Sequence, residues 1–363
     1  MKKLIIIITI LGIIPWNNNY AQGCMEVSDE EGVTILGYIQ SQAEYNFLGE
    51  NLRGESLNTA DMYFNRVRLG VAGNIAYDFS YYAMTELSPT LGGPNILDAF
   101  ITYKRFGPYA NISMGQFRSP FGLELGNTAC HQLFTINRTE VVSNLAGPFR
   151  DFGFMISGGT DKWNPLGTKT QNLIGYKIAI TNGTGLNTPD NNRQKDIVAR
   201  FTFHPFDFIT IGANYRTGKH PALNPDTEDD ERSRYGFDVD LNYKNFRIQG
   251  EFIDGSDKGS YTIGGGCGDP IEVIQGSVNR QGFFAQAMYR TKWDIEPVFK
   301  FEKYDPSMAD TDINDIQNIM TYGFNYYIND WTRMQVNYLY KAEESAVVEH
   351  PNDALLFQMQ IVF

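Results

Sequence analysis

Basic residues recur at alternate positions in several segments, and their side chains could bind small anions. Arg66 and Arg68 are separated by one residue, so both would face the same side of a β-strand. Arg offers a two-pronged donor to a carboxylate or phosphate, and an anion in a narrow, low-dielectric passage needs fixed positive charge. Arg66, Arg68 and Lys104 are therefore candidate anion-binding residues of an inner wall. The same residues could instead pair with acids and stiffen that wall.

Catalytic chemistry has less support in the sequence. The chain contains no G-x-S-x-G, no H-E-x-x-H and no P-loop pattern. His131 lies near Ser143, but a lone His beside a Ser is more often an ordinary hydrogen-bonding residue than half of a catalytic pair. We therefore predict no enzyme activity, no cofactor and no metal site.

The elements that would carry the basic side chains are β-strands, because apolar and polar residues alternate with period 2 over most of the chain. In the last segment one face is apolar and suits lipid, while the other carries Gln358 and Gln360 and suits water. About sixteen such segments recur from Val33 to Phe363, which predicts one all-β domain over residues 33–363. The apolar face of the last segment consists of Leu355, Phe357, Met359, Ile361 and Phe363.

The connections favour a transmembrane antiparallel β-barrel over a soluble sandwich, because short periplasmic turns alternate with long outer loops in such barrels. Only the turn at residues 160–171 is longer than this rule predicts. Short turns are expected at Tyr77–Asp78, Gly107–Pro108, Pro205–Phe206, Lys244–Asn245, Thr291–Lys292 and Asn329–Asp330. Long loops are expected at Gly49–Ala60, Ser119–Pro148, Gly183–Lys195, Gly218–Glu231, Gly255–Asn279, Asp305–Asn314 and Lys341–Asn352.

The two ends of the chain indicate export and assembly. A basic start and a short apolar run predict a signal peptide over residues 1–21, followed by a short N-terminal segment over 22–32. Lipidation of Cys24 is an alternative. Cys130 and Cys267 could form a disulfide in an oxidising compartment or be incidental. A terminal Phe363 that closes an alternating strand is similar to the assembly signal of outer-membrane barrels, which predicts contact with the barrel-assembly machinery.

Three segments of the chain resemble the phosphate-selective porin O and P family of outer-membrane barrels. They are Phe64-Asn65-Arg66-Val67-Arg68-Leu69-Gly70 with Gly73 and Glu86 downstream, Gly115-Gln116-Phe117-Arg118-Ser119-Pro120-Phe121-Gly122-Leu123-Glu124, and Asn137-Arg138-Thr139 through Phe149-Arg150-Asp151-Phe152-Gly153. The resemblance implies a sixteen-stranded barrel, often trimeric, whose third outer loop folds into the lumen.

In this chain the third outer loop would be Ser119–Pro148. By the same resemblance, basic residues of the loop and wall bind the anion, and Arg118, Arg138 and Arg150 stand at those positions. The loop departs from the most selective members of the family, because it offers few Lys and carries Glu124 and Glu140.

Net charge does not by itself decide selectivity. The chain has 42 acidic and 30 basic residues, but only the charges that face the lumen act on a solute there. Strand parity assigns fourteen basic residues inward, namely Arg66, Arg68, Lys104, Lys177, Arg200, Arg216, Arg234, Lys244, Arg247, Arg280, Arg290, Lys292, Lys300 and Arg333. It assigns ten acids inward, namely Glu44, Glu86, Asp98, Asp151, Asp238, Asp240, Glu251, Asp294, Glu296 and Glu302.

The sequence thus predicts an outer-membrane channel for passive diffusion of small solutes, with a preference for phosphate or other anions. The expected surroundings are outer-membrane lipid and lipopolysaccharide, with a homotrimer as one possible assembly and no nucleic-acid partner. The alternative is a barrel that conducts nothing and serves as a subunit of a larger outer-membrane assembly or secretion machine.

Overall fold

The computed structural model describes residues 32–50, 53–160, 172–221, 229–263, 272–308, 316–342 and 351–363. The predicted signal peptide, the lipidation site at Cys24 and Cys267 lie outside these residues. Among the described residues, no helix has the length and apolarity needed to cross a bilayer.

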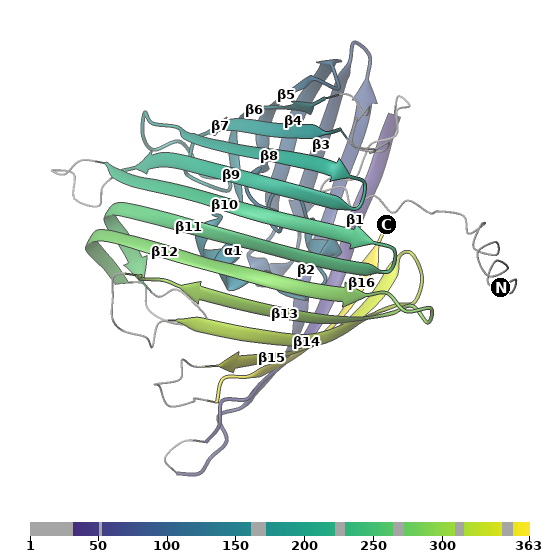
Figure 1. Ribbon diagram of the computed structural model, residues 1–363, viewed down its shortest axis with the longest axis vertical. Coiled ribbons are helices and arrows are strands. Elements are labelled where there is room, and N and C mark those ends of the chain that lie inside the picture. The colour runs from purple at the N-terminus through teal and green to yellow at the C-terminus, as the bar shows by residue number, and fades with distance from the viewer. Residues whose placement is uncertain are drawn as a thin grey trace, which may run out of the picture.

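The described residues form sixteen antiparallel strands that close into one barrel in sequence order, with β1 paired to β16 (Figure 1). This confirms the predicted strand number and fold class. The strands are β1 (Gly32–Asn46), β2 (Thr59–Ile75), β3 (Phe79–Glu86), β4 (Asn95–Phe106), β5 (Ala110–Arg118), β6 (Arg150–Gly159), β7 (Ile174–Thr181), β8 (Asp196–Phe206), β9 (Ile209–His220), β10 (Asp230–Tyr243), β11 (Phe246–Ile263), β12 (Glu272–Tyr289), β13 (Ile295–Asp305), β14 (Gln317–Tyr327), β15 (Thr332–Ala342) and β16 (Ala354–Val362).

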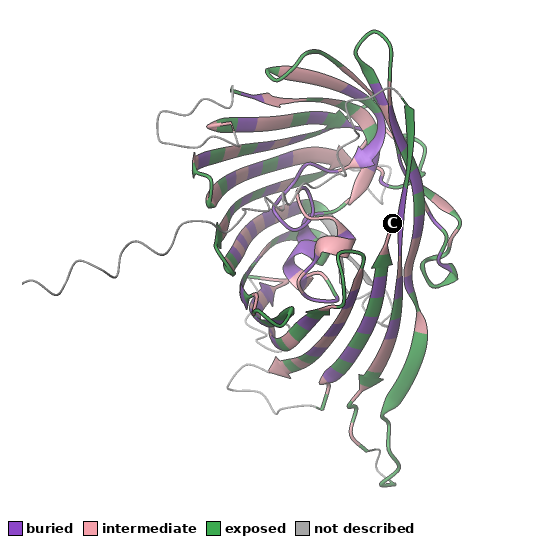
Figure 2. Cartoon of the chain, turned by 90° about the vertical axis from the view of Figure 1, so that its right-hand side faces the viewer, coloured by how far each residue is buried: buried purple, intermediate pink, exposed green. Residues whose placement is uncertain are grey.

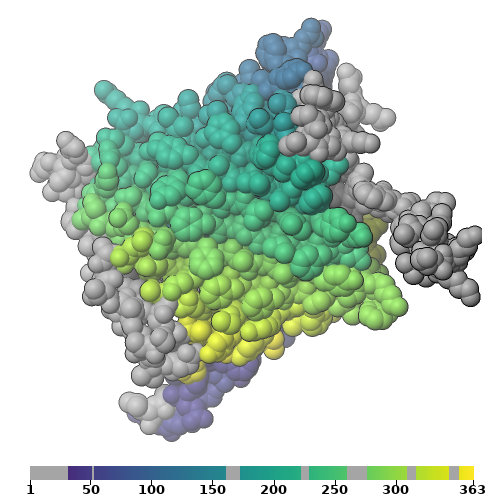
Figure 3. Space-filling view, viewed as in Figure 1, coloured from purple at the N-terminus to yellow at the C-terminus, as the bar shows by residue number. Residues whose placement is uncertain are grey.

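Side chains alternate between the outer and inner faces of the wall, which Figure 2 shows as stripes of buried and exposed residues along each strand. In β16, Phe357 is 37% exposed whereas the next residue, Gln358, is 0% exposed. The outer face seen in Figure 3 runs over successive neighbouring strands from β7 towards β16. An apolar outside around a polar inside is the arrangement that hydrocarbon requires of a barrel.

The barrel closes at its first and last strands with the C-terminal residue in place. The Gly37 amide donates to the Phe363 carbonyl at 2.8 Å, and the Phe363 amide donates back to the Gly37 carbonyl at 2.9 Å. A Cβ at position 37 would lie 2.8 Å from the Phe363 ring and 2.6 Å from the Arg68 carbonyl oxygen, so the close approach requires glycine. The role of Phe363 as an assembly signal stays a prediction.

Four of the predicted short turns separate strands as expected, at Gly107–Pro108, Lys244–Asn245, Thr291–Lys292 and Asn329–Asp330. A fifth, Tyr77–Asp78, lies in the three-residue turn between β2 and β3, and both residues adopt the left-handed conformation at φ 65°.

Two expected connections were wrong. The turn expected at Pro205–Phe206 falls at residues 207–208 instead, because Pro205 sits at an irregularity of β8 where no amide is needed. The long loop expected at Gly255–Asn279 is mostly strand, because β11 continues to Ile263 and β12 begins at Glu272.

The third outer loop (residues 119–149) joins β5 to β6 and contains the turn of 3-10 helix η2 (Cys130–Gln132) and the short helix α1 (Glu140–Leu145). Figure 2 shows this segment within the ring of strands. A second 3-10 turn, η1 (Pro89–Leu91), lies between β3 and β4. The contacts of the third outer loop define the candidate site.

Candidate functional site

Apolar packing holds the third outer loop against one part of the inner wall. Phe121, Leu125, Val141 and Leu145 of the loop are at most 1% exposed and share a cluster with wall side chains. The wall members include Val198 on β8, Ile253 on β11 and Phe284 on β12. Inward apolar residues are unusual in a water-filled barrel, and here the loop covers them.

Polar side chains of the wall also bind the loop backbone. The Gly122 amide donates to Asn214 Oδ1 on β9 at 2.9 Å, and the Glu124 amide donates to Glu251 Oε2 on β11 at 2.9 Å. Further along, the Ile136 amide donates to Asn337 Oδ1 on β15 at 2.7 Å. These bonds satisfy backbone groups that would otherwise be buried without partners.

Charged wall residues complement both ends of α1. At its start the Glu140 amide donates to Glu302 Oε2 on β13 at 2.7 Å. At its end, Arg234 Nε donates to the Leu145 carbonyl at 3.2 Å and Arg216 Nη1 donates to the Gly147 carbonyl at 2.5 Å. Acids at the N-terminus and bases at the C-terminus suit the partial charges of a helix. These bonds fix the loop to the wall formed by β8–β15. The carbonyls of Cys130 and His131 also accept bonds from Gln40 on β1 and Gln360 on β16.

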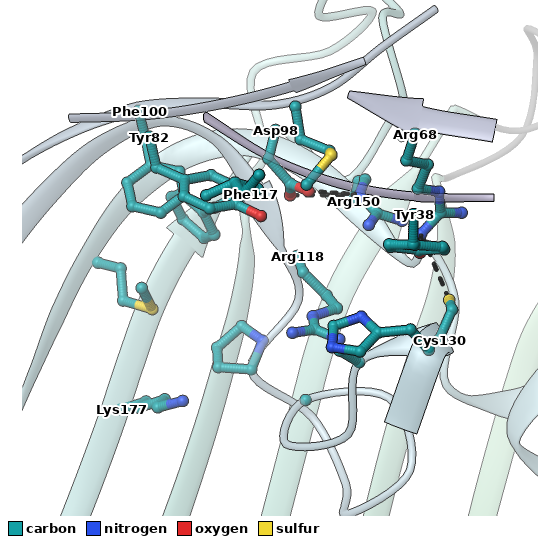
Figure 4. A pocket seen from close by; sticks show the side chains of 17 residues that line it. Tyr38, Arg68, Tyr82, Asp98, Phe100, Phe117, Arg118, Cys130, Arg150 and Lys177 are labelled. Carbon is teal, nitrogen blue, oxygen red and sulfur yellow. Dashed lines mark hydrogen bonds and ion pairs between the residues drawn. The ribbon is translucent and has the colours of Figure 1, made fainter. Parts of the chain in front are cut away.

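A cavity remains between the loop and the opposite wall, formed by β1–β7 (Figure 4). Its volume is about 80 Å³. Four basic side chains and one carboxylate line it: Arg68, Arg118, Arg150, Lys177 and Asp98. The loop contributes Pro120, Gly126, Ala129, Cys130 and His131 to the other side.

Two of the arginines are held by acids of nearby strands, Arg68 by Glu86 on the adjacent strand β3 and Arg150 by Asp98 on β4, two strands away. Arg68 on β2 donates from Nε to Glu86 Oε2 at 2.7 Å and from Nη1 to the Tyr38 hydroxyl at 2.7 Å. Arg150 on β6 donates from Nε to Asp98 at 3.1 Å. These pairs fix the direction of each guanidinium and offset part of its charge.

Arg118 and Arg138 converge on the loop backbone. Arg118 Nη1 donates to the Thr128 carbonyl at 2.8 Å, and Arg138 Nη2 donates to the same oxygen at 3.3 Å. Arg138 Nη1 also donates to the Glu124 carbonyl, and its guanidinium lies 5.8 Å from the centroid of the Phe149 ring. Each of these two arginines thus helps to set the shape of the loop beside the cavity.

Cys130 lies where the positive groups meet. Arg68 Nη1 and Arg138 Nη2 both lie 3.4 Å from its sulfur, and its side chain is buried. Burial raises the pKa of the Cys130 thiol, but Arg68, Arg138, Arg66 and Arg150 together lower it by more, so the pKa lies well below its ordinary value. The lowered pKa reports a positive electrostatic potential at the Cys130 sulfur.

His131, the next residue, is the candidate that the sequence offered for catalysis. Burial lowers the pKa of its imidazole to about 4, opposed in part by Cys130. It is therefore neutral near pH 7, and its ring lies 5.0 Å from the Tyr38 ring. Among the described residues, no group of three His, Cys, Asp or Glu side chains could hold a metal ion.

The structure brings five of the six predicted anion-binding residues together. We call Arg66, Arg68, Arg118, Arg138 and Arg150 the arginine cluster. Arg66 joins it through Gln40, to whose Oε1 its Nη1 donates at 2.9 Å. Lys104 lies apart, exposed near the short-turn end of β4, where its Nζ donates to Asn74 at 3.0 Å.

Sequence reasoning missed parts of this site and misplaced others. Lys177 was assigned inward but not to the site, although strand parity carried the information. For Cys130 the sequence left a disulfide and an incidental cysteine open. Among the described residues its thiol is free, and it lies beside Arg68 and Arg138. Lys244, Lys292 and Asp294, which parity assigned inward, lie in short turns between strands.

The comparisons with known proteins agree with this geometry. The model of the family described as phosphate-selective porin O and P matches residues 38–207, which contain the whole arginine cluster. No curated protein matches the sequence.

Solved porins share the fold at low sequence identity. The anion-selective porin from Comamonas acidovorans has a TM-score of 0.63 at 11% identity, covering 92% of this chain and 100% of that one. OmpF of Salmonella typhi, in a complex with daunomycin, has a TM-score of 0.62 at 11% identity, covering 91% and 97%.

The trimer form of OmpT, an outer-membrane protein of Vibrio cholerae, has a TM-score of 0.58 at 10% identity and covers 92% of this chain and 100% of that one. At these identities the likeness concerns the fold. Together with the family match over residues 38–207 and the closed sixteen-stranded barrel, it identifies this chain as an outer-membrane porin that is similar, over those residues, to the phosphate-selective porin O and P family.

Proposed function

We propose that this porin prefers anions and that they pass between the third outer loop and the wall formed by β1–β7. The observation that carries the proposal is the cavity in that position, which has four basic side chains and one acidic side chain on its lining. A positive constriction between low-dielectric walls raises the local concentration of anions and lowers that of cations. Phosphate or another oxyanion suits the two-pronged donors of Arg.

The acidic net charge of the chain is compatible with this proposal. Several inner-wall acids are paired with bases away from the cavity, as in Asp238 with Arg200 at 2.5 Å and Asp196 with Arg216 at 2.6 Å. Paired charges of opposite sign give a weak field at a distance. The cluster around Cys130, by contrast, contains more bases than acids.

We further propose that the barrel assembles as a homotrimer in contact with outer-membrane lipid and lipopolysaccharide. The support is the porin fold that this chain shares with the trimeric OmpT structure, and the broad apolar outer face that could meet either lipid or a neighbouring copy. Assembly through the terminal Phe363 belongs to the same proposal.

Ion selectivity tests the proposed function. The protein in a planar lipid bilayer under a KCl gradient is expected to give a reversal potential with the sign of anion preference. Replacing both Arg118 and Arg138 by Gln keeps hydrogen-bond donors but removes two charges, and should lower the anion-to-cation permeability ratio by roughly three- to tenfold.

Lys104→Gln is the matched control, because it removes one basic charge from the inner side of the same barrel but outside the cluster. It should leave the ratio nearly unchanged. A wild-type reversal potential of the opposite sign would refute anion preference. A correctly folded barrel with no conductance would instead support the alternative of a non-conducting subunit.

A further inference from the structure

The cavity beside the arginine cluster has a second, apolar side. Tyr82 on β3, Phe100 on β4 and Phe117 on β5 form a continuous row of rings across three neighbouring strands, joined by Met155 on β6. The Tyr82 and Phe100 rings stack with centroids 5.5 Å apart, and Phe117 meets Phe100 edge-on at 6.4 Å. Figure 4 shows this row on one side of the cavity, with Arg68 and Tyr38 on the other.

This apolar row is covered at Phe117, which is 2% exposed, but only partly at its other members. Ile253 and Phe284, which also face inward, are covered by the third outer loop and are at most 2% exposed. Tyr82, Phe100 and Met155 are only partly buried and line the cavity. Inward positions of a porin are ordinarily polar. A passage for inorganic anions alone would gain nothing from the partly exposed rings of Tyr82 and Phe100 on its lining.

The charges of the cavity favour a ligand with a modest negative charge. Glu86 already binds Arg68, and Asp98, which itself lines the cavity, already binds Arg150. Each acid offsets one base, and Asp98 would repel a multiply charged anion that came close. A ligand with a single carboxylate suits the positive charge that these two acids leave.

We propose that the cavity binds small organic acids that have one carboxylate and a flat apolar body, such as aromatic carboxylates. The carboxylate faces Arg118 and Lys177 of the lining rather than the two arginines that acids already bind, while the body lies against Tyr82 and Phe100. This inference rests on the proposed function, because the ligand must first enter an anion-preferring passage. Apolar contact with the rings then adds affinity that a purely polar anion of the same charge lacks.

Block of the chloride current by added carboxylates provides the test. Benzoate is the probe, and acetate and gluconate are polar comparators that are smaller and larger than benzoate. Contact with the apolar row covers one face of the benzoate ring. The half-blocking concentration of benzoate is therefore expected to be roughly five- to tenfold lower than that of acetate or gluconate.

Two variants each make one member of the apolar row polar while leaving the arginines of the cavity in place. Met155→Gln conserves side-chain size, and Tyr82→Ser removes one ring. Each should reduce the preference for benzoate by at least about threefold and preserve the reversal potential in KCl. Met114→Gln, on the outer face of β5 where Met114 is 61% exposed, is the control for the chemical change and should leave benzoate block unaltered.

The outcomes separate this inference from the proposed function. Benzoate that blocks no better than acetate and gluconate, or equal benzoate block in wild type, Met155→Gln and Tyr82→Ser, would overturn the organic-acid inference even if the channel prefers anions. A wild-type channel that prefers cations in KCl would instead overturn the proposed function, and the inference with it.

Discussion

Replacing Asp238 by Asn is expected to destabilise the barrel by about 3–5 kcal/mol, because it leaves the guanidinium of Arg200 buried without its counter-charge. Arg200 binds Asp238 through two parallel bonds, Nη1 to Oδ2 at 2.5 Å and Nη2 to Oδ1 at 2.9 Å. The two side chains are 2% and 0% exposed. Water cannot readily replace the lost carboxylate at such a site.

The same change should loosen the third outer loop. Asn214 accepts bonds at Oδ1 from the Gly122 amide and from Arg200, and donates from Nδ2 to Asp238 at 2.7 Å. Asp238 thus orients the amide that holds the start of the loop. We expect the variant channel to show larger and noisier currents than wild type.

Equilibrium unfolding of the barrel in lipid vesicles by urea, followed through tryptophan fluorescence, measures the first effect. The matched control is Asp78→Asn, which breaks the Arg105–Asp78 pair at the surface, where the side chains are 65% and 42% exposed. Exposed ion pairs contribute little to stability, so this control should change the free energy of unfolding by less than about 1 kcal/mol. Equal losses in both variants would show that the inner pair is solvated like a surface pair.

Cys130 is expected to react with an anionic thiosulfonate reagent at least about tenfold faster than with a cationic reagent of similar size, after correction for their rates with a free thiol. The positive side chains that surround the sulfur attract the first reagent and repel the second. The thiolate is the reactive form, and these side chains stabilise it.

The lowered pKa also predicts how the rate depends on pH. An ordinary thiol slows roughly 80-fold between about pH 8 and about pH 6, because it becomes protonated. Because the pKa of Cys130 is lowered, its rate should fall clearly less than that of an ordinary thiol over this range. A rate that follows the ordinary profile would contradict the assigned electrostatics.

Mass spectrometry of modified protein gives these rates. Cys24 and Cys267 should first be replaced by Ser, so that Cys130 is the only thiol of the chain. Arg66→Gln then removes one of the charges that lower the Cys130 pKa, and should slow the reaction at low pH. Lys104→Gln removes a distant charge and should not.

The sequence was most informative about which side chains face the lumen and which face lipid. Alternation placed Arg66 and Arg68 inward because a shift by one residue would have exposed charge to lipid. Local composition was a poorer guide at residues 255–279, where glycines suggested a loop but pairing between β11 and β12 extends the strands.

The candidate site depended on the path of the third outer loop, which local sequence does not encode. Ile136 bonds Asn337, which is 201 residues away, and such contacts fix how deep the loop lies. Strand parity could therefore assign Lys104 to the inner face without revealing that it lies far from the loop. For the same reason, nothing in the sequence around Cys130 indicated that Arg68 and Arg138 would surround its sulfur.

The most direct measurement is the single-channel current before and after complete modification of Cys130 with the anionic reagent. If ions pass between the third outer loop and β1–β7, the added sulfonate should reduce the current by at least about half and weaken the anion preference, while a small neutral reagent should do less. Complete modification that leaves both current and selectivity unchanged would show that ions take another route through the barrel.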